Sequence, residues 1–140
     1  MSVRDIVDSV VKKYKTRSPY ELADLLRIKI SRCELGSIHG YYLNKYRIKQ
    51  IVLNCDLNSC EEKWVLAHEI GHAIMHQDVN TPFLKANTLL STNKYEIEAN
   101  KFAAELLISD DQLEEYKYCS LEQISRILGY HEKLIRLRFQ

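Results

Sequence analysis

Apolar residues recur at helical spacing near the start of the chain, so we expect an amphipathic helix over residues 3–15. Ser18, Pro19 and Glu21 follow it and form a typical helix start. A Ser side chain can cap the first turn, and Pro suits the first helical position. We therefore expect a second, short helix that runs through Leu26. Both helices are interpreted as scaffold.

After residue 27 the hydrophobic period changes to one typical of strands. Residues 28–30 alternate between apolar and basic side chains. Residues 41–43 and 46–53 flank Asn44-Lys45, which predicts a hairpin turn at that pair. We expect a small antiparallel sheet of about three strands in this part of the chain.

The strongest helical signal lies over residues 59–76, which read SCEEKWVLAHEIGHAIMH. Ser59 and Glu62 match a capping box at its start. A later helix is expected to begin at Asn93, with Glu96 as its capping residue. The residues expected on the buried stripe of this later helix are Tyr95, Ala99, Phe102, Ala103 and Leu106.

The tail carries two further capping boxes, Ser109 with Gln112 and Ser120 with Gln123. Gly129 can end the second of these helices in the left-handed region. A last helix follows after a short turn, so the tail is typical of a helix-turn-helix.

We assign residues 1–140 to a single α+β domain in which the small sheet packs on a helical bundle. Residues 109–140 form a helix-turn-helix-like subregion of it. DNA binding requires a denser basic face than this subregion offers. We therefore expect the tail to pack or to dock a protein, and DNA contact remains the alternative.

Composition and charge indicate which partners and which cellular compartment to expect. The 140 residues include 20 basic and 19 acidic side chains, a formal net charge of +1, so no overall field favours nucleic acid or an anionic membrane. The first residues lack the apolar run of a signal peptide, and no stretch approaches the roughly 20 apolar residues of a membrane span. We expect a cytoplasmic protein with no membrane partner.

The four cysteines are Cys33, Cys55, Cys60 and Cys119. Without a secretion signal we expect reduced thiols, buried as small apolar side chains. Cys55 and Cys60 together with two later histidines weakly resemble a zinc finger. The spacer after Cys60 has seven residues where that motif has about twelve, which disfavours the alternative.

His68 and His72 enclose the pattern H-E-x-x-H within the helix predicted over residues 59–76. Residues four apart share one face of a helix, so both imidazoles can reach one ion at about 2.0–2.1 Å. Glu69 lies about 100° further round the same turn, close enough to contact a water on that ion. The pattern therefore predicts a metal site with two histidine ligands and an adjacent general base.

A catalytic zinc site needs a third protein ligand. His76 is in register with His72, but we interpret it as a helix-end histidine near the last carbonyls. The remaining candidates on the later helix are Glu96, Glu98 and Glu105. We favour Glu98, at the edge of the buried stripe, since Glu96 is explained as a cap and Glu105 as an exposed charge.

Two segments of the chain resemble the ImmA/IrrE family of metallo-endopeptidases. They are LAHEIGHAIMH over residues 66–76 and EIEANKFAAELL over residues 96–107. Residues 51–54 also look like the last strand of that family. The sequence departs from the family after Leu107, where Ile-Ser stands in place of a frequent Met-Pro pair. The resemblance therefore defines the chemistry more closely than the substrate.

The resemblance implies a gluzincin-like minimal metallopeptidase. His68, His72 and Glu98 would be its metal ligands, and Glu69 its catalytic base. Zn²⁺ is the expected cofactor, with Mn²⁺ as the alternative. The implied substrate is a protein, a helix-turn-helix transcriptional repressor of a phage or mobile element. The alternative function is a non-cleaving, metal-containing module that sequesters a repressor or an antitoxin.

Overall fold

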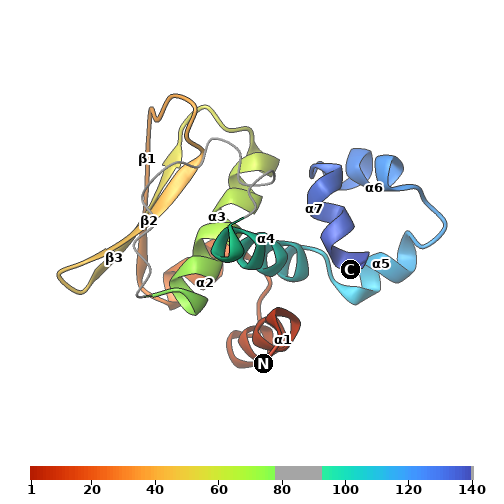
Figure 1. The fold of residues 1–140 in the computed structure, drawn as a ribbon, viewed down its shortest axis with the longest axis horizontal. Coiled ribbons are helices and arrows are strands. Elements are labelled where there is room, and N and C mark those ends of the chain that lie inside the picture. The colour runs from red at the N-terminus through yellow and green to blue at the C-terminus, as the bar shows by residue number, and fades with distance from the viewer. Residues whose placement is uncertain (78–92, 140) are drawn as a thin grey trace.

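The computed structural model describes residues 1–77 and 93–139. Its elements in chain order are α1 (Val3–Tyr14), α2 (Pro19–Leu25), β1 (Ile28–Cys33), β2 (Gly40–Lys45), β3 (Ile48–Asn54), α3 (Ser59–Met75), α4 (Lys94–Leu107), α5 (Asp110–Glu115), α6 (Leu121–Leu128), α7 (Glu132–Arg136) and the 3-10 helix η2 (Leu137–Phe139). Figure 1 shows the sheet at one end, α3 and α4 in the middle, and α5 to α7 at the other end. The α+β prediction is confirmed.

The sheet is mixed. Its strand order is β1-β3-β2, with β1 parallel and β2 antiparallel to β3. The expectation of three strands is confirmed, but the expected antiparallel pairing is wrong for β1. Three consecutive residues of β3, Ile51, Val52 and Leu53, are buried, so this strand takes the central position. β1 and β2 are therefore the two edges of this sheet, and β3, which follows them in the chain, pairs between them.

The hairpin turns at Tyr46 and Arg47, two residues later than predicted. Both residues have positive φ angles, 55° and 64°, which the two-residue turn that matches strand twist requires. Buried Tyr42 pairs with Ile51 in this register, whereas a turn at Asn44 and Lys45 would have placed it opposite Arg47. Burial of the sheet face thus decides the register against the local turn preference.

Helix α3 is capped by Asn58 and Glu61, one residue ahead of the expected pair. Glu62 is therefore available for long-range contacts. Arg32 of β1 donates two hydrogen bonds of 2.9 Å to its carboxylate, and the Tyr20 hydroxyl of α2 donates a third. The Arg32 guanidinium lowers the pKa of Glu62, whereas burial and the nearby carboxylate raise the pKa of Tyr20 to about 12. The three contacts fix the start of α3 on β1 and α2.

Helices α3 and α4 approach closely at Gly71. A Cβ atom placed on Gly71 would lie 3.1 Å from the Phe102 side chain, tighter than ordinary van der Waals contact. The predicted buried stripe on α4 is confirmed for the fully buried Ala99, Phe102, Ala103 and Leu106. Tyr95 is the exception, with 38% of its surface exposed.

The C-terminal helices begin and end as the sequence predicts. Ser109 with Gln112 caps α5, and Ser120 with Gln123 caps α6. Gly129 ends α6 at a φ of 83°. Each capping box satisfies two backbone groups that the helix itself leaves without partners.

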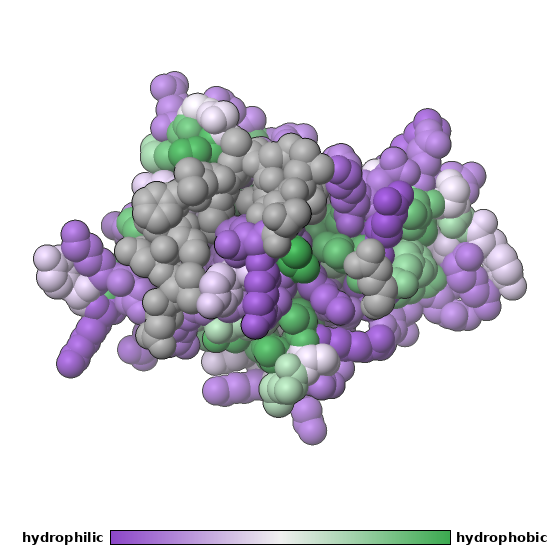
Figure 2. All heavy atoms as spheres, in the orientation of Figure 1, coloured by the Kyte–Doolittle hydropathy of each residue, from purple (hydrophilic) through white to green (hydrophobic). Residues whose placement is uncertain are grey.

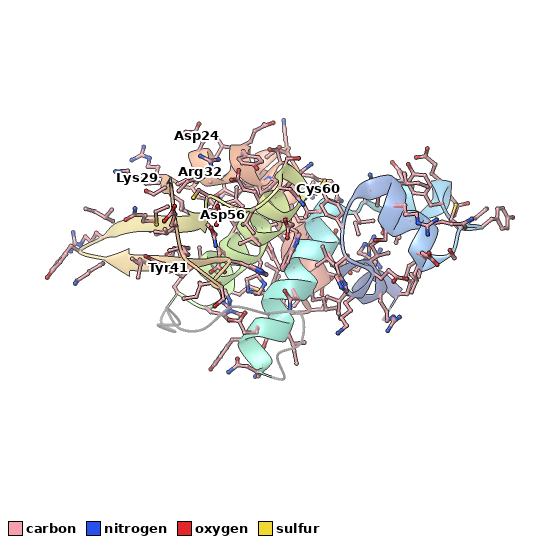
Figure 3. The ribbon with its side chains drawn as sticks, turned by 90° about the horizontal axis from the view of Figure 1, so that it is seen from above. Asp24, Lys29, Arg32, Tyr41, Asp56 and Cys60 are labelled. Atoms are coloured by element: carbon pink, nitrogen blue, oxygen red, sulfur yellow. The ribbon has the colours of Figure 1, made fainter. Side chains whose placement is uncertain are left out.

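All four cysteines are free thiols. Cys33 and Cys55 are exposed, so the expectation of burial is wrong for these two. Cys60 lies at the start of α3 (Figure 3), and its sulfur is 3.9 Å from the carbonyl oxygen of Leu128. It thus packs against the end of α6, which argues against a zinc finger that includes this thiol.

Arg138 holds the C-terminal segment on α4 and α5. Its guanidinium donates hydrogen bonds of 2.8 Å to Glu105 and 2.6 Å to Asp110, and its Nε donates to the Ile108 carbonyl. The side chains of Arg138 and Glu105 are 2% and 8% exposed, so Glu105 is not the exposed charge expected. Arg138 also holds the pKa of Asp110 below its usual range.

We expect Arg138→Met to lower the free energy of unfolding by about 3–5 kcal/mol, because it leaves the buried Glu105 carboxylate without its cation. Urea denaturation measures the loss. The control Arg126→Met removes an exposed ion pair with Glu122 and should cost at most about 1 kcal/mol. Equal losses in the two variants would contradict the assignment.

Over the described ranges, the structure contains no helix that combines the length and apolar character needed to cross a membrane. The face in Figure 2 is largely hydrophilic where it is coloured, with small separate hydrophobic patches.

Candidate metal centre

The centre of the molecule holds the H-E-x-x-H segment of α3. His68, Glu69 and His72 are each 1% exposed, and their potential ligand atoms lie within 4.8 Å of one another. The imidazole centroids of His68 and His72 are 4.8 Å apart. Because these histidines are one helical turn apart, the helix directs both rings to the same side.

Glu96 of α4 faces these histidines. One of its carboxylate oxygens lies 2.7 Å from His68 Nε2, and the other lies 3.1 Å from His72 Nε2. Glu98, the expected third carboxylate, lies instead with Oε2 3.4 Å from His76 Nε2. The structure thus brings Glu96 to His68 and His72, whereas the sequence favoured Glu98 for that position. Helices α3 and α4 lie against each other in both ribbon views (Figure 1 and Figure 3).

The cap of α4 explains why the sequence analysis missed Glu96. The Asn93 side chain accepts hydrogen bonds from the backbone N–H groups of Tyr95 and Glu96, so the first turn is capped without the Glu96 carboxylate. Glu98 is about 200° further round the helix, and its side chain is 32% exposed. A usable signal was present: Glu96 and Asn100 are polar residues four apart, hence on one face.

Asn100 orients His68. Its side-chain oxygen lies 2.7 Å from His68 Nδ1 and accepts the ring proton there. A neutral imidazole has only one ring proton, so this hydrogen bond leaves a lone pair on Nε2, which faces Glu96. A lone pair on that nitrogen is what a metal ligand requires.

The chemistry of these side chains fits a divalent cation. With the His68 and His72 ring protons on Nδ1, two nitrogen lone pairs and two Glu96 oxygens converge as acceptors. Glu69 adds a second buried carboxylate, with Oε2 3.8 Å from His68 Nε2. Buried carboxylates are costly without a compensating cation, so this set of atoms is suited to an ion held by two histidines and a glutamate.

Two further histidines, His39 and His76, pack against aromatic rings of α3. His76 ends α3, but its imidazole is buried against the ring of His72 rather than placed at the last carbonyls. His39 is half-buried, and its ring makes an edge-on contact with Trp64. Trp64 contacts His68 in turn, so aromatic rings continue along α3 on both sides of the candidate ligands.

A cavity of about 270 Å³ lies elsewhere on α3, between this helix, α1 and the sheet. Its lining residues are Ser9, Val10, Lys13, Tyr14, Leu26, Ile28, Lys49, Ala73, Ile74 and Gln77. None of the residues of the candidate metal centre lines this cavity, so we do not assign it to the reaction.

One family profile and two known proteins are similar to this chain. The profile of the IrrE N-terminal-like domain of peptidase family M78 matches residues 23–136, a range that includes α3 and α4. Uncharacterized immunity region protein 2 of Bacillus phage phi105 is 42% identical over 139 residues, which cover 97% of this chain and 88% of that protein. Metallopeptidase ImmA of Bacillus subtilis (strain 168) is 30% identical over 113 residues, which cover 81% of this chain and 67% of that protein.

Proposed function

Because the chain belongs to the IrrE N-terminal-like (M78) family of metallopeptidases, we propose that it is a metal-dependent endopeptidase with its active site between α3 and α4. The observation that carries the proposal is the Glu96 carboxylate, which lies within 3.1 Å of both Nε2 atoms of the H-E-x-x-H histidines. A helix that carried this pattern for structural reasons alone would not need a buried carboxylate there.

The ligands we propose are His68, His72 and Glu96. Two histidines and one carboxylate with an open position suit Zn²⁺, and Mn²⁺ is the alternative. The ion would act as a Lewis acid and lower the pKa of a bound water toward about 7. Glu98 is not included in this set, because its carboxylate faces His76.

Glu69 is the catalytic base in this proposal. Its carboxylate is on the same turn as His68 and lies 3.8 Å from His68 Nε2, so it can contact a water held at the site. It accepts a proton as that water attacks the peptide carbonyl, and it then passes the proton to the leaving amine. The burial of Glu69 keeps bulk solvent from competing for this transfer.

Strand β2 is suited to hold an extended substrate. It is at the edge of the sheet formed by the described strands, and an edge strand can pair with a peptide through backbone hydrogen bonds. It also runs next to α3: a Cβ atom on Gly40 would lie 3.2 Å from Val65, one turn before the candidate ligands. We propose that the peptide backbone is aligned along β2 as it enters the site.

The substrate we propose is a helix-turn-helix transcriptional repressor of a phage or mobile element. This is supported by the similar phage protein, which is described by its place in an immunity region. Such a substrate would place the reaction in the cytoplasm. Direct DNA contact by the peptidase is not part of the proposal.

We expect metal removal to abolish cleavage. The purified protein is incubated with the repressor encoded next to its gene, and the products are identified by mass spectrometry. Cleavage at a defined bond should stop after treatment with a chelator and return when Zn²⁺ or Mn²⁺ is added to the dialysed protein. Cleavage that persists after complete metal removal would contradict the proposal. A stable complex with no cleavage under any metal would favour the sequestering module.

A further inference from the structure

His76 and Glu98 form a partly buried pair beside His72, and the proposed reaction uses neither residue. His76 is 6% exposed and lies one helical turn after His72 on the same face of α3. Its Nδ1 is 3.0 Å from His72 Nδ1, and its Nε2 is 3.4 Å from Glu98 Oε2. The ring is held on another side by the edge of Tyr95, with centroids 4.9 Å apart.

The contact between the two Nδ1 atoms requires one proton, and either histidine could supply it. If His76 supplied it, a neutral His72 would carry its own proton on Nε2, the atom that faces Glu96. That form of His72 cannot bind a metal through Nε2. If His72 supplies it, His72 Nε2 has a lone pair, and the proton of neutral His76 lies on Nε2, where Glu98 accepts it.

We propose that His76 is a positioning residue that keeps His72 in its metal-binding tautomer, and that Glu98 fixes His76 in the orientation this requires. The inference rests on the proposed function, because it assumes His72 as a ligand. Asn100 has the corresponding role for His68, but it accepts the proton directly with an amide oxygen. In this proposal a single residue, Asn100, orients His68. His72 is oriented by two residues, His76 and Glu98.

The test measures Zn²⁺ affinity by competition with a chelator and follows the ring tautomers by ¹⁵N NMR. His76→Phe removes the acceptor for the His72 proton, and we expect it to weaken Zn²⁺ binding by about 10–100-fold and to remove the Nδ1–H signature of His72. Glu98→Ala acts on a partly exposed side chain, should not disturb folding, and is expected to weaken binding by about 10-fold.

A conservative variant separates positioning from packing. His76→Asn places an amide oxygen near the position of Nδ1, so it retains the acceptor and should restore most of the affinity lost in His76→Phe. As a matched control, Glu122→Ala removes a carboxylate from an exposed ion pair and should leave affinity unchanged.

The inference is overturned if folded His76→Phe binds Zn²⁺ as tightly as the wild type, or if folded His76→Asn is as weak as His76→Phe. Failure of the proposed function has a different signature. A wild-type protein that binds Zn²⁺ tightly, responds to these variants and cleaves no protein would refute the peptidase and leave the positioning role in place. Absence of a tight Zn²⁺ site in the wild-type protein would contradict both the peptidase function and the positioning role of His76.

Discussion

Glu69→Gln is expected to lower the rate of peptide-bond hydrolysis by about 10²–10⁴-fold. The amide has nearly the shape of the carboxylate but cannot accept the proton of the attacking water. The histidines and Glu96 are unchanged, so the metal content should remain that of the wild type. Cleavage rates of the repressor substrate, measured with variant and wild-type protein at equal metal content, check the prediction.

Glu115→Gln is the control for this substitution, because it makes the same chemical change at an exposed site at the end of α5. It should cleave at the wild-type rate. Substantial cleavage by metal-loaded Glu69→Gln would assign the base to another group. A variant that has lost its metal would show instead that Glu69 supports the site and not the proton transfer.

Glu96→Ala is expected to weaken Zn²⁺ binding by more than about 100-fold and to abolish cleavage, whereas Glu98→Ala should weaken binding by only about 10-fold. The difference follows from geometry, because the Glu96 carboxylate is the one that lies between the two Nε2 atoms. Loss of an outer partner such as Glu98 typically costs about 10–100-fold, and loss of a ligand costs more. Metal analysis of both variants after dialysis against a weak chelator gives the answer.

Either result identifies which of Glu96 and Glu98 holds the metal, since the two residues lie close together on one helix and have the same side chain. If Glu98→Ala lost its metal and Glu96→Ala kept it, the third ligand expected from sequence would be reinstated. The arrangement of α4 in the structure would then not be the metal-bound arrangement.

Local spacing in the sequence indicates which residues of the candidate site share a helix face, but not how the two helices face each other. Spacing within one helix determines which residues share a face, so the pairing of His68 with His72 followed directly. The third carboxylate depends on how α4 rotates against α3, and local spacing does not report that rotation. A capping role for Glu96 was plausible in sequence, but the Asn93 side chain alone provides the cap.

The same distinction explains the errors in the fold. Capping boxes at Ser109 and Ser120 involve residues three apart and were confirmed. The ion pair of Glu105 with Arg138 joins residues 33 apart in sequence, and no periodicity could indicate it. The hairpin turn at Tyr46 and Arg47 was missed because pairing along the whole of β2 and β3 outweighed the preferences of the turn residues.

The glycine between Glu69 and His72 has a consequence for catalysis as well as for packing. Ligand distances in a metal site are restricted to within about 0.2 Å. A methyl group on Gly71 would require the Phe102 side chain of α4 to give way by a few tenths of an ångström. Glu96 is on the same helix as Phe102, so a displacement passed on to α4 would be as large as the tolerance of the proposed site. The close approach of α3 and α4 at Gly71 therefore bears on the placement of Glu96 in the proposed metal site.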